Sequence, residues 1–180
     1  VAAALAGARD PDDARAALTA LAAATAPEIA RRLSPEVAPL LDRCPTHRVP
    51  LLGGRADLAK HWAVSAAITA RVGAQASEAL GTWKELSDSN RGGSGFSFVD
   101  LAADRSGFRW AAALTDPAQF VAARDMLLRG QAARLVPPAL LTAPEGMSSE
   151  QFEARWRATD SAAYAASVAR IDRALDAVMR

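Results

Sequence analysis

A single stretch of the chain brings together the side chains that could do chemistry. His61, one of only two histidines, follows Asp57 by four residues, so a carboxylate could bond its ring if both lie on one helix. A histidine oriented in this way makes a good general base or metal ligand, because the carboxylate raises the basicity of the ring. Alternatively, Asp57 caps the helix and His61 is a packed residue. The spacing leaves both interpretations open.

Two acidic pairs flank the turn that follows. Glu85 and Asp88 are three residues apart at the expected end of the helix, where the helix dipole disfavours carboxylates unless a cation lies nearby. Asp100 and Asp104 are four residues apart on the next expected helix, where like charges destabilise an isolated helix. If these two helices pack antiparallel, both pairs approach His61.

An enzymatic role would divide these residues into two sets. The catalytic set would be His61 as the base, Glu85 as the acid or nucleophile, and Asp88 as a third catalytic residue. Substrate or a divalent cation would be bound by a wider polar set, namely Asp57, Lys60, Lys84, Ser94, Asp100 and Asp104. The spacing does not identify a metal, and we predict no other cofactor. The alternative is that the acids at 100 and 104 are offset by the arginines at 105 and 109.

Other familiar sites are missing from the sequence. The loop Gly92-Gly93-Ser94-Gly95 could present backbone N–H groups to an anion, but it lacks the Gly-Lys-Ser/Thr ending of a phosphate-binding loop. There is no His-Glu-x-x-His zinc motif and no Gly-x-Ser-x-Gly elbow. Cys44 is the only cysteine, so Cys44 and His47 predict no zinc site. Gly107 would let a neighbouring helix approach closely.

Composition predicts that helices position these residues. Hydrophobic residues make up 51% of the chain, many of them alanine, whereas aromatic residues make up only 6%. Alanine favours helices, and strands prefer the β-branched and aromatic residues that are scarce here. Lys and Arg total 21 against 20 acids, a net charge of +1 that predicts no attraction to nucleic acid or anionic lipid.

We therefore expect one all-α domain of about six to eight helices, with the polar hairpin near its centre. Residues 1–43 would form N-terminal helices, 56–114 the hairpin and 115–180 the C-terminal helices. Within the first hairpin helix, Trp62, Ser65, Ile68 or Thr69, and Val72 should face the core. Cap residues, prolines and glycines predict helices over 11–25, 27–33, 34–42, 56–86 (with a kink or division near Gly73), 98–114, 118–129 and 150–178.

Part of the hairpin resembles a known family. Residues 57 to 109, under a third of the chain, are similar to the signature of VanZ-like proteins and related small bacterial envelope lipoproteins. Here the lysine directly precedes the histidine instead of following the aspartate. The resemblance implies a bacterial cell-envelope setting and a polar helical-hairpin site, and it supplies no reaction. The matching strings are Asp57-x-x-Lys60-His61-Trp62, Lys84-Glu85-x-x-Asp88 and Gly95-Phe96-Ser97-Phe98-x-Asp100-Leu101-x-x-Asp104-x-x-Gly107.

Two classes of function remain open. The first is a non-catalytic accessory or binding protein of the envelope, in which the cluster is a buried structural network. The second is an envelope hydrolase acting on a glycan, peptidoglycan or lipid-linked substrate. We favour the first class because no spacing in the sequence demands a reaction. We expect a soluble chain, either periplasmic or associated with the envelope. No transmembrane segment is expected, since no run approaches the ~18 apolar residues that a span needs. An envelope glycan or a protein could be its partner. Residues 1–8 could be the end of a cleaved export signal or a helix start.

Overall fold

The predicted all-α class is confirmed. The structure, a computed structural model, describes residues 1–33, 38–43, 50–72, 95–130 and 135–180. Within these ranges the β-type pairings are two isolated bridges, and no described helix is both long enough and apolar enough to cross a membrane. Besides a short 3-10 turn at Pro138–Leu140, the described residues form nine α-helices: α1 (Ala2–Leu5), α2 (Pro11–Thr25), α3 (Pro27–Leu33), α4 (Ala38–Arg43), α5 (Ala56–Val72), α7 (Phe98–Thr115), α8 (Phe120–Leu128), α9 (Ser149–Trp156) and α10 (Ala162–Val178).

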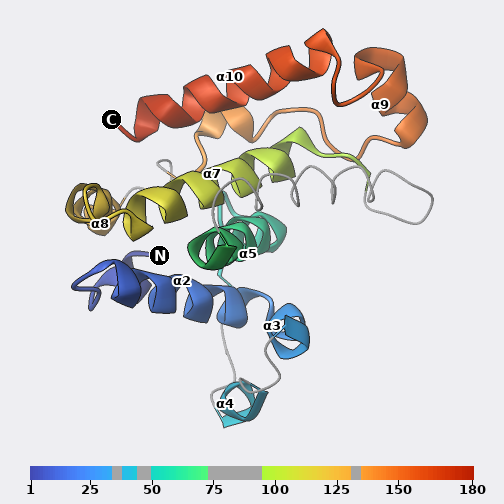
Figure 1. The fold of residues 1–180 in the computed structure, drawn as a ribbon. Coiled ribbons are helices and arrows are strands. Elements are labelled where there is room, and N and C mark those ends of the chain that lie inside the picture. Colours follow the sequence, from blue (N-terminus) through green and yellow to red (C-terminus); the bar gives the residue numbers. More distant parts are fainter. Residues whose placement is uncertain (34–37, 44–49, 73–94, 131–134) are drawn as a thin grey trace.

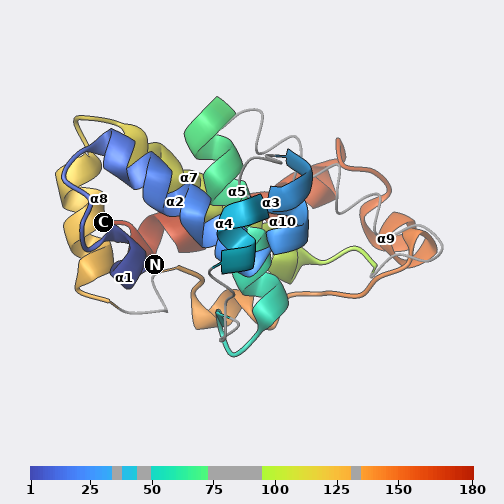
Figure 2. The same ribbon diagram turned by 90° about the horizontal axis from the view of Figure 1, so that it is seen from below.

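Helix α7 lies at the centre of the fold. Figure 1 shows α10 and α9 on one side of α7 and α5 on the other, with α2 beyond α5. Figure 2, seen from below, shows α2 and α5 crossing under α7, with α3 and α4 nearest the viewer. Every residue of α7 from Phe98 to Phe108 is buried, including both aspartates and an arginine. Because α7 has neighbours on several sides, its charged side chains are enclosed and need partners.

Helices α5 and α7 approach closely at Gly107, as predicted. A Cβ atom at this position would lie 2.3 Å from the carbonyl oxygen of Trp62, a distance that no real side chain tolerates. One residue earlier, the hydroxyl of Ser106 accepts a hydrogen bond of 3.0 Å from the indole N–H of Trp62. The glycine and the serine together bring the two backbones close enough for short polar side chains to bridge them.

Most predicted helix starts are confirmed. The carboxylate of Asp10 accepts from the Asp13 N–H, and the hydroxyl of Ser97 accepts from the Asp100 N–H. Helix α8 begins at Phe120, two residues later than predicted. The carboxylate of Asp116 bonds the Ala118 N–H and so holds a turn before the helix. Residues 73–94, with the rest of the predicted 56–86 helix and its kink at Gly73, lie outside the described residues, as do 34–37 and 44–49.

The prediction of one continuous helix over 150–178 was wrong. It is two helices, and Arg157 between them has φ of +63°. Ser161 then caps α10 by accepting from the Tyr164 N–H. Both helices nevertheless bury residues at helical spacing. Phe152, Trp156, Ser167, Ile171 and Leu175 are buried, while Ala163 is exposed.

An aromatic cluster fixes α9 against the start of α7. The rings of Phe96 and Phe152 have centroids 4.4 Å apart, and those of Phe98 and Trp156 are 4.9 Å apart. Tyr164 from α10 contacts Phe96 at 6.2 Å. Such pairs each stabilise by roughly 0.5–1.5 kcal/mol beyond their buried area. The cluster therefore holds the N-terminal end of α7, which carries the acidic residues, in a fixed position.

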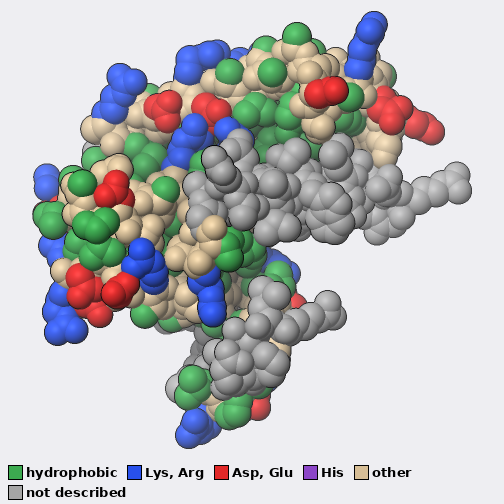
Figure 3. Space-filling model, in the orientation of Figure 1, with side chains coloured by type: hydrophobic (Ala, Val, Ile, Leu, Met, Phe, Trp, Pro, Cys, Tyr) green, Lys and Arg blue, Asp and Glu red, His purple; other side chains and the backbone are tan. Residues whose placement is uncertain are grey.

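Charges on the surface show no dominant sign. On the face in Figure 3, basic and acidic side chains of the described residues are interspersed, in keeping with the near-neutral net charge.

Of the positions predicted to face the core from α5, Trp62, Ser65 and Thr69 are buried. Val72 is 62% exposed, so the prediction was wrong for this residue.

Candidate functional site

His61 lies between two carboxylates of α7. Its Nδ1 atom is 3.2 Å from each carboxylate oxygen of Asp104. Its Nε2 atom is 3.6 Å from Oδ2 of Asp100, one turn away. The side chain of His61 is only 10% exposed. The histidine on α5 and the i, i+4 acids on α7 therefore meet, as predicted, although α5 crosses α7 at a steep angle in Figure 2 and does not lie antiparallel beside it. We call His61, Asp100 and Asp104 the polar cluster.

Asp104 is held on a second side by a hydroxyl. Ser65, one turn after His61 on α5, donates a hydrogen bond of 2.7 Å to Oδ1 of Asp104. The Asp104 side chain is 8% exposed. An aspartate that accepts from two groups on the neighbouring helix is a buried cross-link between α5 and α7. The sequence marked Ser65 only as a core position, because the hydroxyl's partner is on a helix some forty residues away.

The buried carboxylate of Asp100 is less well hydrogen-bonded than that of Asp104. Its Oδ1 atom is buried and has no hydrogen-bond partner among the described residues; the nearest cation, Nη2 of Arg55, is 3.7 Å away. Burial raises the pKa of the Asp100 carboxyl, and this outweighs the opposing effect of His61. The protonated form of Asp100 is therefore favoured more than that of an exposed aspartate.

The predicted Asp57–His61 pair does not form. The carboxylate of Asp57 instead bonds the guanidinium of Arg55 at 2.5 and 3.1 Å, which lowers the pKa of Asp57. Arg55 also bonds Glu145 at 2.7 Å, and no sequence signal marked Arg55 or Glu145 as part of the site. Lys60 forms an exposed ion pair with Glu28 at 2.5 Å, so it is not part of the polar cluster either. Arg55 lies in the bridged turn just before α5, where no periodic pattern singles it out.

Arg105 and Arg109, which follow Asp104 on α7, form ion pairs with an acid on another helix. Nε of Arg105 lies 2.6 Å from Oδ1 of Asp172 on α10, and Nη1 of Arg109 lies 2.8 Å from the same atom. Burial alone would raise the pKa of Asp172, but these two bonds outweigh it and lower the pKa. The suggestion that the arginines offset Asp100 and Asp104 was therefore wrong. They hold α10 against α7.

Four of the predicted site residues cannot be placed beside His61. Lys84, Glu85, Asp88 and Ser94 lie outside the described residues, as do Cys44 and His47. Among the residues that are described, no group of three or more His, Cys, Asp or Glu side chains is arranged to hold a metal ion. The described half of the site is thus a histidine–carboxylate network.

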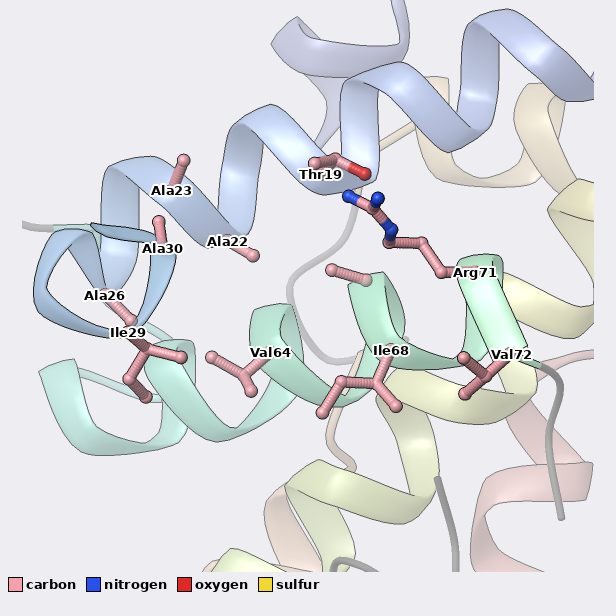
Figure 4. Close-up of a pocket in the computed structure, with 11 residues that line it drawn as sticks. Thr19, Ala22, Ala23, Ala26, Ile29, Ala30, Val64, Ile68, Arg71 and Val72 are labelled. Carbon is pink, nitrogen blue, oxygen red and sulfur yellow. The ribbon is translucent and has the colours of Figure 1, made fainter. Parts of the chain in front are cut away.

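Two cavities lie elsewhere in the described structure, and no member of the polar cluster lines either one. The first, of about 290 Å³, is an apolar pocket between α2, α3 and α5. Figure 4 shows Ile29, Val64 and Ile68 along it, with the Arg71 side chain reaching toward Thr19 at one end. The second, of about 260 Å³, lies where α9 and α10 meet the segment before residue 145.

Comparisons of the chain with protein-family models, with curated proteins and with solved structures find no significant match. An imidazole flanked by two carboxylates can act as a cross-link when protonated, or as a base if one nitrogen reaches substrate.

Proposed function

We propose that this chain is a non-catalytic binding or accessory protein of the bacterial cell envelope, in which the polar cluster joins α5 to α7. The observation that carries the proposal is that carboxylates face both ring nitrogens of His61 while its side chain is 10% exposed. A general base needs one nitrogen within reach of a substrate proton. A cross-link needs one ring nitrogen bonded to an acid of α7, and Nδ1 lies 3.2 Å from both carboxylate oxygens of Asp104.

Further support comes from Asp104, whose buried carboxylate accepts a second bond across the two helices, from Ser65 at 2.7 Å. Buried charge pairs are strongly destabilising to break, because removing one partner leaves the other buried without compensation. A structural cluster and an active site therefore predict different consequences for the same substitutions.

The test is thermal unfolding of His61→Gln and Asp104→Asn. We expect each to destabilise by about 3 kcal/mol, which for a chain of this size lowers Tm by about 6–12 °C. Asp160→Asn is the matched control, because Asp160 is exposed and should change Tm little. Unchanged Tm in both cluster variants would contradict the structural role.

An envelope hydrolase is the second candidate, favoured by one observation. Asp100, with its raised pKa, lies 3.6 Å from Nε2 of His61, so an acid and a base could share a proton there. This candidate predicts cleavage of peptidoglycan fragments that His61→Gln abolishes while the fold survives. The absence of cleavage by wild-type protein over a broad panel of envelope glycans would remove it.

The envelope location rests on the resemblance of residues 57–109 to VanZ-like proteins. We expect the natural protein, expressed from its complete gene in a bacterial host, to fractionate with the periplasm or membranes. Recovery entirely in the cytoplasmic fraction would contradict this part of the proposal and leave the role of the polar cluster unaffected.

A further inference from the structure

The second cavity carries an inference that deepens the proposed binding role and rests on it. Two arginines line this cavity, Arg155 from α9 and Arg170 from α10, and no Asp or Glu among the described residues lines it. Neither arginine has an ion pair within the described residues. Elsewhere in the described structure, the arginines on α7 are both paired with acids of α10. Two cations at one cavity without counter-charges point to an anionic ligand.

Existing contacts orient both guanidinium groups. Arg155 stacks over the ring of Trp156, with its Cζ atom 4.7 Å from the ring centroid. Nη2 of Arg170 donates to the hydroxyl of Ser167 at 3.1 Å. That hydroxyl also accepts from the indole of Trp156 at 3.0 Å and donates to a backbone carbonyl. Arg170 is thus held by one of its N–H groups, and a guanidinium has five to offer.

The remaining lining is mostly apolar. Phe98, Leu140 and Ile171, all buried in the core, form part of the wall, and Thr142 contributes a hydroxyl. The volume of about 260 Å³ lies just below the range of drug-sized ligand sites, so it suits a ring or a short branched chain. Arginine binds carboxylates and phosphates through two parallel hydrogen bonds.

We propose that this cavity binds a small organic anion, with its carboxylate or phosphate on Arg155 and Arg170 and its apolar body against Phe98 and Trp156. The ligand would approach from the exposed side of the arginines. It would not contact the polar cluster, whose residues do not line the cavity.

The test is a titration of the whole chain with three probes: 3-phenylpropionate, phenyl phosphate and the neutral 3-phenylpropanamide. Binding is measured by calorimetry and by the shift of the Trp156 indole N–H resonance. We expect at least one anion to bind with Kd below about 1 mM and the amide to bind at least about tenfold more weakly. Which anion binds more tightly distinguishes a carboxylic acid from a phosphate ester.

Matched arginine variants complete the test. Arg170→Gln and Arg155→Gln should each weaken anion binding about tenfold, which corresponds to 1.4 kcal/mol. Arg173→Gln is the control, because Arg173 is exposed on the same helix and does not line the cavity. The proposal is overturned if neither anion binds, if the amide binds as well as the anions, or if Arg173→Gln weakens binding as much as Arg170→Gln. These readouts are independent of the unfolding experiments on His61, so the two proposals can fail separately.

Discussion

Asp100 and Asp104 are one turn apart on α7, yet they differ in what holds them. Asp104 accepts from Ser65 and lies 3.2 Å from the ring of His61. Among the described residues, Asp100 lies 3.6 Å from that ring and 3.7 Å from the guanidinium of Arg55. Burying a carboxylate is costly unless hydrogen bonds compensate it. We therefore expect Asp104 to stabilise the fold more than Asp100 does.

This contrast predicts unequal effects of the same substitution. Asp104→Asn should lower the free energy of unfolding by about 3 kcal/mol, because it breaks a buried charge pair. Asp100→Asn should leave it unchanged or raise it at neutral pH, since the neutral amide avoids the cost of burying a charge. Chemical unfolding of the two variants in parallel measures both. Equal losses would show that Asp100 and Asp104 support the fold in the same way.

The close contact between helices α5 and α7 depends on Gly107, which has no side chain. Gly107→Ala places a Cβ atom 2.3 Å from the backbone of Trp62, which cannot give way as a side chain would. We expect a loss of about 1–3 kcal/mol, the usual cost of overpacking. Gly7→Ala is the control, because nothing lies within 4 Å of the added atom. Urea unfolding of both variants tests this, and equal stability would place the closest helix contact elsewhere.

How far the sequence predicts these elements depends on how local their signals are. Asp10, Ser97 and Ser148 mark helix starts because a cap bonds a backbone N–H only three residues away. The break at Arg157 was missed because an apolar stripe of helical period continues on both sides of it. Ser161 was the available signal, since it is a cap residue followed by a run of helix-forming alanines.

The partners of charged side chains were harder to predict than the helices. The sequence placed His61 near the acids of the next helix, because a hairpin brings them together. Spacing within one helix also suggested a bond between His61 and Asp57, and Arg105 and Arg109 were the alternative partners for Asp100 and Asp104. Asp172, the real partner of Arg105, is 67 residues away, and only the packing of α10 on α7 brings the two together.

For the molecule as a whole, these pKa shifts predict how stability depends on pH. The pKa of Asp172 is lowered in the folded state, so its contribution is complete above the unfolded value of about 3.9 and is lost as the pH falls through the folded pKa. The advantage of wild type over Asp172→Asn should therefore shrink as the pH falls from 6 to about 2. Acid unfolding curves of the two proteins, with Asp160→Asn as the reference, measure it. An advantage that is constant with pH would contradict the account of the arginine pair.

Asp100 should behave in the opposite way. Its folded pKa is raised, so its contribution is complete below about pH 3.9 and is lost as the pH rises through the folded pKa. Wild type should therefore gain stability relative to Asp100→Asn as the pH falls from 7 to about 4. The same unfolding series supplies this comparison, and a relative loss of stability would mean that Asp100 is better stabilised as a carboxylate than its contacts indicate.

The most direct test of the structural role is a double-mutant cycle between His61 and Asp104. The free energies of unfolding of wild type, His61→Gln, Asp104→Asn and the double variant give the coupling between the two side chains. We predict a coupling of about 2 kcal/mol, within the range for residues in direct contact, because both single variants lose the same cross-link. Additive effects, or two single variants as stable as wild type, would contradict the claim that this cluster joins α5 to α7.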